Sequence, residues 1–161
     1  MTLKSQVVHY AREAGFDEVR IASAEPFPEH NEVARQRVRL GYMDGMPWYT
    51  EERVVIASDP VSLLTGARSF IAVAVSYLPK EDGGEYSSGI QGKVARYARS
   101  PDYHQVMKER LHILADGLYR FAGRPVKTRI FVDDSPLLER AVAERAGLGW
   151  FGKNTNILTA T

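Results

Sequence analysis

The stretch Phe70-Ile-Ala-Val-Ala-Val-Ser-Tyr-Leu78 decides the fold that this sequence predicts. It is a continuous apolar run of strand-forming residues, which is typical of a strand covered on both faces. We therefore expect it in the centre of a sheet. Further strands are predicted over residues 18–24, 126–132 and 156–159.

Helices are predicted around these strands, because capping residues and glycines delimit several amphipathic segments. The mixture indicates an α/β (α+β) fold, a layered sheet with helices packed on it, in a single domain over residues 1–161. The loop from Pro79 to Gly92 joins two ordered parts, and the aromatic loop from Gly41 to Tyr49 has the composition of one that grips a ligand. The predicted helix starts are Thr2, Asn31, Asp59-Pro60, Ser100-Pro101-Asp102 and Ser135-Pro136, with ends at Gly15, Leu40, Leu64, Gly123 and Gly147.

The composition is that of an ordinary globular domain: 161 residues, 44% of them hydrophobic and 25% charged. The chain contains no cysteine, which excludes a disulfide scaffold, a thiolate zinc site and an iron–sulfur cluster held by these residues alone. His9, His30 and His112 lack the spacing of metal ligands, so no metal site is predicted. No segment approaches the ~18 apolar residues of a membrane span, and we expect a cytoplasmic protein without a membrane partner.

Although the net charge of the chain is only +1, one segment contains a local excess of basic side chains. Between residues 93 and 129, nine Lys and Arg stand against three Asp and Glu. Aromatic residues interleave the stretch from Lys93 to His104, which could therefore meet a phosphate backbone or the anionic edge of a cofactor. A solvated helix face explains the same pattern equally well.

A glycine-rich turn, Gly147-Leu-Gly-Trp-Phe-Gly-Lys-Asn154, matches two phosphate-binding motifs as a string. Both motifs need a strand before them and a helix after them, and here the predicted order is reversed. Two other interpretations stay open. The turn is either a helix end with Gly147 in a left-handed conformation, or a glycine-lined wall against a flat ligand, with Trp150, Lys153 and Asn154 around it.

Two adjacent acids lie in Val132-Asp-Asp-Ser-Pro136, where a predicted strand runs into a helix. Asp134 or Ser135 could cap that helix. Asp133 is left without a capping role, and we expect it to face a pocket, where burial against an apolar ligand would suit it to act as a general acid.

Three segments together resemble the N-terminal, cobalamin-binding part of epoxyqueuosine reductase, an enzyme of tRNA queuosine biosynthesis. They are Ser58-Asp-Pro-Val-Ser-Leu-Leu-Thr-Gly-Ala-Arg68, Ala95-Arg-Tyr-Ala-Arg-Ser-Pro-Asp-Tyr-His104 and the segment from Phe131 to Asn154. The resemblance implies a nitroreductase-like domain that holds cob(II)alamin. It also implies an oxidoreductase that reduces epoxyqueuosine to queuosine in tRNA, with tRNA as a partner of the stretch from Lys93 to His104.

The resemblance also assigns roles to single residues. Asp133 matches the aspartate of a V-D-x-x-P pattern and would donate a proton to the epoxide oxygen, while Asp134 falls at a variable position. Ile56, Arg96, Lys153 and Asn154 match positions at the corrin, together with Asp133. The two four-iron clusters of the family lie in a ferredoxin-like domain that this cysteine-free chain lacks, so we expect the isolated chain to be inactive and its iron–sulfur domain to be missing or separate.

Three alternatives compete with this interpretation. The chain could be a non-catalytic corrinoid-binding module, or a flavin-binding relative of nitroreductases. If none of these holds, it is a structural α/β domain whose glycine-rich turn is only a turn.

Overall fold

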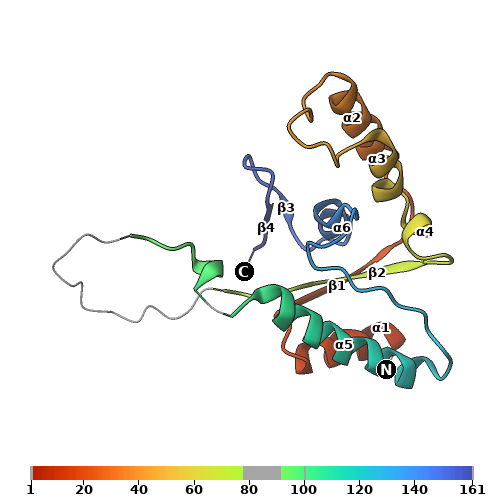
Figure 1. Cartoon of the computed structure of the whole chain (residues 1–161). Coiled ribbons are helices and arrows are strands. Elements are labelled where there is room, and N and C mark those ends of the chain that lie inside the picture. Colours follow the sequence, from red (N-terminus) through yellow and green to blue (C-terminus); the bar gives the residue numbers. More distant parts are fainter. Residues whose placement is uncertain (1, 78–91, 100, 161) are drawn as a thin grey trace.

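The computed structural model describes residues 2–77, 92–99 and 101–160, and its centre is a two-stranded antiparallel sheet. Strand β1 (Glu18–Ser23) pairs with β2 (Ser69–Ala74) in a register that places Ile21 opposite Ile71. Helices α1 (Leu3–Glu13) and α5 (Tyr103–Ala122) cover one face of the sheet, and α6 (Glu139–Arg145) lies on the other (Figure 1). The predicted α+β arrangement of a sheet between helices is confirmed.

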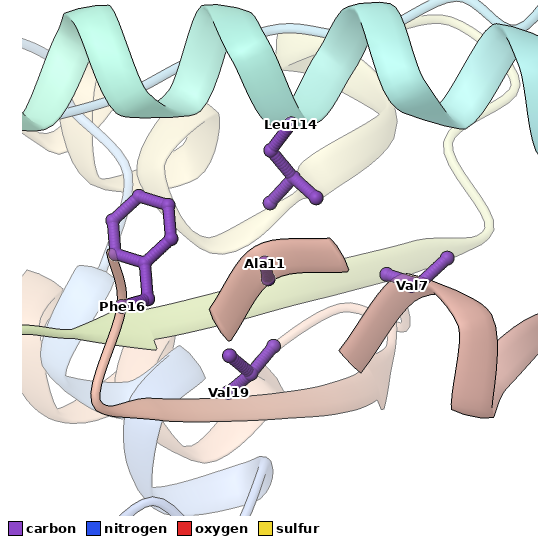
Figure 2. Packing of buried hydrophobic residues seen from close by; sticks show 5 residues of the cluster. All are labelled: Val7, Ala11, Phe16, Val19 and Leu114. Atoms are coloured by element: carbon purple, nitrogen blue, oxygen red, sulfur yellow. The ribbon is translucent and has the colours of Figure 1, made fainter. Parts of the chain in front are cut away.

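The alternation of β2 side chains builds both layers of the core, because successive side chains of a strand point to opposite faces. Ile71 and Val73 pack in the cluster under α1 and α5, whereas Phe70 and Ala72 pack in the cluster under α6. In Figure 2, Leu114 of α5 points toward Ala11 of α1, and Val19 of β1 closes the cluster from the strand side. These three side chains are almost completely buried.

Local signals place the long helices as predicted. The Thr2 side chain accepts a hydrogen bond from the Ser5 backbone N–H at the start of α1, and Asp102 accepts one from the His104 N–H at the start of α5. Gly123 ends α5 with a φ of 61°, a left-handed conformation that glycine adopts without steric cost. Asp59 caps the short helix α4 (Pro60–Leu63), also as predicted.

The second predicted helix exists, but its cap was assigned wrongly. Helix α2 (Pro28–Arg39) begins before Asn31, whose amide donates instead to the Ser58 hydroxyl, 2.6 Å away. Ser58 ends α3 (Glu51–Ser58), a helix that the sequence analysis missed although the Thr50 side chain caps it. Asn31, which the sequence suggested as a helix cap, thus makes a tertiary contact between α2 and α3 instead.

The strand predictions need three corrections. Within the described residues β2 pairs with β1 alone, so it is an edge strand and not the centre of a larger sheet. Residues 126–132 were predicted as a strand, but they form no ladder with any described strand. The strand predicted near the C-terminus is β4 (Ile157–Leu158), and it pairs in a hairpin with β3 (Trp150–Phe151), which was not predicted.

The remaining predictions concern the ends of helices and the loops between elements. Helix α6 begins at Glu139, two residues after Leu137, the first residue of the helix that the sequence predicts after Ser135-Pro136. The Ser135 hydroxyl instead accepts a hydrogen bond from the Leu137 N–H in a turn before the helix. A 3-10 helix, η1 (Arg96–Ala98), precedes α5. Except for Gly92, the loop predicted from Pro79 to Gly92 lies outside the described residues. Among the described helices, none has both the length and the apolarity needed to cross a membrane.

Candidate active site

A cavity of about 1670 Å³ runs alongside β2. Its walls are β2 and the extended segment 124–133, with one face of α5 on one side and α6 on the other. Most of the lining side chains are apolar. Among the described residues that line it, Asp133 and Glu139 carry the carboxylates.

Asp133 lies at the exposed rim of this cavity, where segment 124–133 turns toward α6. Its φ of 54° is a left-handed conformation, which aspartate tolerates better than most other residues with a side chain. The Tyr103 hydroxyl donates a hydrogen bond of 2.6 Å to its Oδ2 atom. This bond to a carboxylate, together with burial, raises the pKa of Tyr103 to about 12.

Glu139 supports the same turn from the first residue of α6. Its Oε1 atom accepts a hydrogen bond of 3.0 Å from the Asp133 backbone N–H. Burial, and then the negative charge of Asp133, raise the pKa of Glu139 above its usual value. The site therefore contains two carboxyl groups in different environments, one exposed at the rim and one half-buried behind it.

The neighbouring acid, Asp134, contacts a different set of groups from Asp133. One of its carboxylate oxygens accepts from the Val132 N–H at 3.1 Å, and the other lies 2.6 Å from the Lys108 ammonium. The hydrogen bond with Lys108 is the main cause that lowers the pKa of Asp134. Asp133 lines the cavity as predicted, and Asp134 has a structural role, although that role is not the cap of α6.

The structure places one of the other predicted site residues at the cavity and the remaining three away from it. Arg96, in η1, lines the same cavity as Asp133. Ile56 on α3 is 42% exposed and does not line it, and Lys153 and Asn154 lie exposed in the β3–β4 turn. The Asn154 side chain accepts a hydrogen bond from the Asn156 N–H within that turn.

The glycine-rich turn runs from the end of α6 into the β3–β4 hairpin, and its glycines fit these two positions. Gly147 ends α6 with a φ of 70°, which confirms the helix-end interpretation for that residue. A Cβ atom at Gly149 would lie 2.1 Å from the Leu158 carbonyl oxygen, so the absent side chain makes room for β4. The turn leads into a strand, which is the wrong context for a phosphate-binding loop, as the sequence indicated.

The basic stretch from Lys93 to His104, which ends in the first turn of α5, carries stacked aromatic rings. The rings of Tyr103 and His104 stack with centroids 4.1 Å apart, and Tyr97 meets Tyr103 edge to face at 6.5 Å. The His104 Nδ1 atom lies 2.7 Å from the Asp102 carboxylate, and its hydrogen bond lowers the pKa of Asp102. Tyr97 is 55% exposed, so an aromatic surface and cations occur together beside Asp133.

Sequence reasoning missed Tyr103 and Glu139. Thirty residues separate Tyr103 from Asp133, and no local pattern records a contact over that distance. Glu139 is closer to Asp133 in sequence, but the pattern is that of an ordinary acidic residue in the first turn of a helix. Within the described residues, no group of three or more His, Asp or Glu is placed to hold a metal ion.

These features define a class: an α+β domain with an acid and an arginine at the rim of an apolar cavity. The family model described as epoxyqueuosine reductase QueG, DUF1730, matches residues 58–134. An epoxyqueuosine reductase of Bacillus anthracis is 36% identical over 160 residues, which cover 98% of this chain and 41% of the relative. The chain is therefore similar in sequence to epoxyqueuosine reductases along nearly the whole of the 161 residues.

Solved structures agree with the sequence comparison. A crystal structure of epoxyqueuosine reductase with a tRNA-Tyr epoxyqueuosine-modified stem loop matches with a TM-score of 0.83 and 31% identity, over 98% of this chain and 41% of that one. The Bacillus subtilis enzyme, solved with its aspartate-bearing catalytic loop swung out of the active site, matches with a TM-score of 0.78 and 30% identity, over 98% and 41% of the two chains. This chain thus spans about two fifths of the length of these relatives.

Proposed function

We propose that this chain forms the part of an epoxyqueuosine reductase that binds the cofactor and protonates the substrate. The observation that supports this proposal most strongly is the position of Asp133. Its carboxyl group lies on a left-handed turn at the rim of a cavity and accepts a hydrogen bond from a tyrosine hydroxyl. A relative has a catalytic loop that carries an aspartate. Asp133 would supply the same kind of group in this chain, from a turn at the cavity rim.

The reaction removes an epoxide oxygen from epoxyqueuosine, which takes two electrons and two protons and releases water. Asp133 in its protonated form would donate a proton to the epoxide oxygen, which improves that oxygen as a leaving group. Tyr103 holds the Asp133 carboxyl through its hydroxyl, and Glu139 holds the backbone of the same residue. The exposed position of Asp133 leaves it accessible to a substrate that approaches from solvent.

A cobalamin is the cofactor that we propose for these side chains. Arg96, Lys153 and Asn154 supply hydrogen-bond donors, Ile56 an apolar contact and Asp133 an acceptor, which suits a flat macrocycle fringed with amide groups. These side chains lie at the cavity and on exposed surfaces away from its lining, so they would meet the periphery of a large ligand. Such a cofactor would supply the electrons of the reaction.

A visible-absorption titration of the purified chain with cob(II)alamin tests this proposal. We expect saturation at one equivalent and weaker binding by the Arg96→Ala and Lys153→Ala variants. Lys127→Ala is the matched control, since it removes a cation from the cavity lining without touching the proposed set. Flavin mononucleotide is the control ligand. Tighter binding of the flavin, or binding that is equal in all variants, would contradict the proposal.

The tRNA is the proposed substrate carrier, with the stretch from Lys93 to His104 as its contact. Cations and exposed aromatic rings together suit a single-stranded loop, whose bases stack and whose phosphates attract Arg and Lys. We expect the chain to bind an epoxyqueuosine-modified stem loop with an affinity that falls steeply with salt. Arg99→Ala should reduce that affinity, and Arg37→Ala, on the exposed side of α2, should not. A localisation in the cytoplasm, where tRNA is modified, is part of this proposal.

A further inference from the structure

The free edge of β2 is well defined by its hydrogen bonds to β1. The Ala24 N–H donates to the Arg68 carbonyl at 3.1 Å, just beyond the paired strands. In an antiparallel pair, opposite residues alternate between those that exchange hydrogen bonds and those that do not. Phe70 and Ala72 therefore bond to β1, whereas Ile71 and Val73 direct their backbone N–H and C=O groups away from it.

Those groups face the cavity, and the opposite wall is also strand-like. Every residue from Phe70 to Ala74 and every residue from Arg124 to Asp133 lines the same space. Residues 126–131 lie in no helix, turn or bend and have the sequence of a strand, yet they pair with no strand in the part of the chain that the structure describes. Two strand edges thus border one cavity, and neither pairs on that side with any strand that the structure describes.

The other two sides of the cavity are apolar helix faces. Met107, Leu111 and Leu118 line it from α5, and Val142 and Ala143 line it from α6. A strand between β2 and residues 126–131 would therefore be covered on both faces, as in the centre of an α/β sheet. Buried backbone groups need partners, and such a strand would provide them for both edges.

We propose that this cavity is a slot for one β-strand, supplied by polypeptide of the kind that forms the larger, unmatched part of the epoxyqueuosine reductases. The chain spans 41% of the Bacillus anthracis relative, so that protein has ample further polypeptide to provide a strand. The strand has apolar side chains at successive positions, because helices cover both faces. Cations such as Arg99, Arg124 and Lys127 outnumber the carboxylates of the lining, which favours acidic residues at its ends. Pairing would also fix the segment that carries Asp133.

Hydrogen exchange of backbone amides tests the slot. In the chain alone, we expect the amides of Ile71 and Val73 to exchange faster than those of Phe70 and Ala72. The part of the Bacillus anthracis relative that this chain does not match is then added as a separate polypeptide. Addition should slow exchange at Ile71, at Val73 and at alternate residues of 126–131, by at least ~10-fold, and leave Phe70 and Ala72 unchanged.

Proline variants supply a matched control. Val73→Pro removes an N–H that faces the slot, so the chain should fold and lose the response to the added polypeptide. Ala72→Pro removes an N–H that bonds to β1 and should unfold the sheet without any addition. Val73→Ala, which keeps the N–H, separates lost packing from the lost donor and should still respond.

Three results would overturn the proposal. One is unchanged exchange at Ile71 and Val73 after addition, and another is a response that Val73→Pro retains. The third is protection of these amides in the chain alone that rises with protein concentration, since that would identify a second copy of this chain as the occupant. None of these outcomes depends on cobalamin, so they leave the test of the proposed function separate.

Discussion

At the scale of single residues, the two adjacent acids show how environment assigns different roles to the same side chain. Asp134 is held by a lysine and a backbone N–H, and Asp133 by a tyrosine hydroxyl at the cavity rim. The sequence predicted which acid would face the cavity, because only one of the two was without a local partner. It did not predict the partner, since Tyr103 comes from another element.

The pKa of Tyr103 reports the contact with Asp133. The neutral hydroxyl donates to the carboxylate, so loss of its proton is disfavoured and the pKa is raised to about 12. Asp133→Asn should return it toward 10, and this difference is measurable from phenolate absorbance during an alkaline titration. Asp134→Asn is the control and should leave the tyrosine titration unchanged. Identical curves for wild type and Asp133→Asn would show that the hydrogen bond does not form in solution.

Glu139 should make the free energy of unfolding depend on pH. Its pKa is raised in the folded state by burial, so the folded protein holds this proton more tightly than the unfolded chain does. Its contribution to the free energy of unfolding is therefore greatest below the ordinary pKa of 4.5 and declines as pH rises through the folded pKa. Glu139→Gln keeps an acceptor for the Asp133 N–H, and it should unfold at higher denaturant than wild type at pH 7. The two should converge at pH 4, and a constant difference would exclude titration of Glu139 as the cause.

At the scale of elements, stability is unevenly distributed. Helices α1 and α5 bury side chains against the sheet, while α2 buries none. Helix α2 is instead joined to α3 by polar contacts, in which Arg35 and Arg39 both bind Glu51. The sequence predicted α1, α2 and α5, although it assigned the wrong cap to α2, because local signals indicate where a helix lies and not what it packs against.

The packing of α5 can be measured with two adjacent residues. Leu114 is 2% exposed, and Ile113 is 48% exposed on the same helix. Leu114→Ala should lower the free energy of unfolding by about 2–5 kcal/mol through the lost burial and the cavity left behind. Ile113→Ala should change it by less than about 0.5 kcal/mol. Urea denaturation of both variants checks this, and similar losses would mean that α5 does not pack on the sheet through this face.

The junction of α2 and α3 should weaken in acid. Hydrogen bonds from Arg39 and Arg35 lower the pKa of Glu51 to about 2. Its contribution to stability is therefore present above the ordinary value of 4.5 and is lost as pH falls toward 2. Amide exchange in α2 should accelerate over that range, and Glu51→Gln should show the fast exchange already at neutral pH. Fast exchange in wild type at pH 7 would argue that these ion pairs do not hold the helix.

At the scale of the whole molecule, the main feature is a cavity large enough for a strand or a ligand in a chain of this length. Helices surround a sheet of only two described strands, and the apolar groups beside β2 face open space. Exposed apolar surface of this kind marks an interaction site in a soluble protein.

The cavity should bind an apolar dye in the native state. We expect ANS fluorescence to rise on addition of the folded chain and to saturate, because the dye is sheltered from water between β2 and residues 124–133. Denaturation in urea should abolish the signal, and Ile113→Ala should preserve it. Fluorescence no higher than with the denatured chain would mean that the cavity is closed in solution.

The sequence by itself determined the features that depend on neighbours a few residues away. Thr2, Asp59 and Asp102 cap their helices, Gly123 and Gly147 end theirs, and the resemblance to epoxyqueuosine reductases was already present in three short segments. Only the tertiary structure decided the contacts between distant segments. It pairs Asn31 with Ser58 and Tyr103 with Asp133, and among the described residues it provides no partner strand for 126–132. The physical reason is that a helix satisfies its backbone within one segment, whereas a strand is completed only by another strand, which its own sequence does not specify.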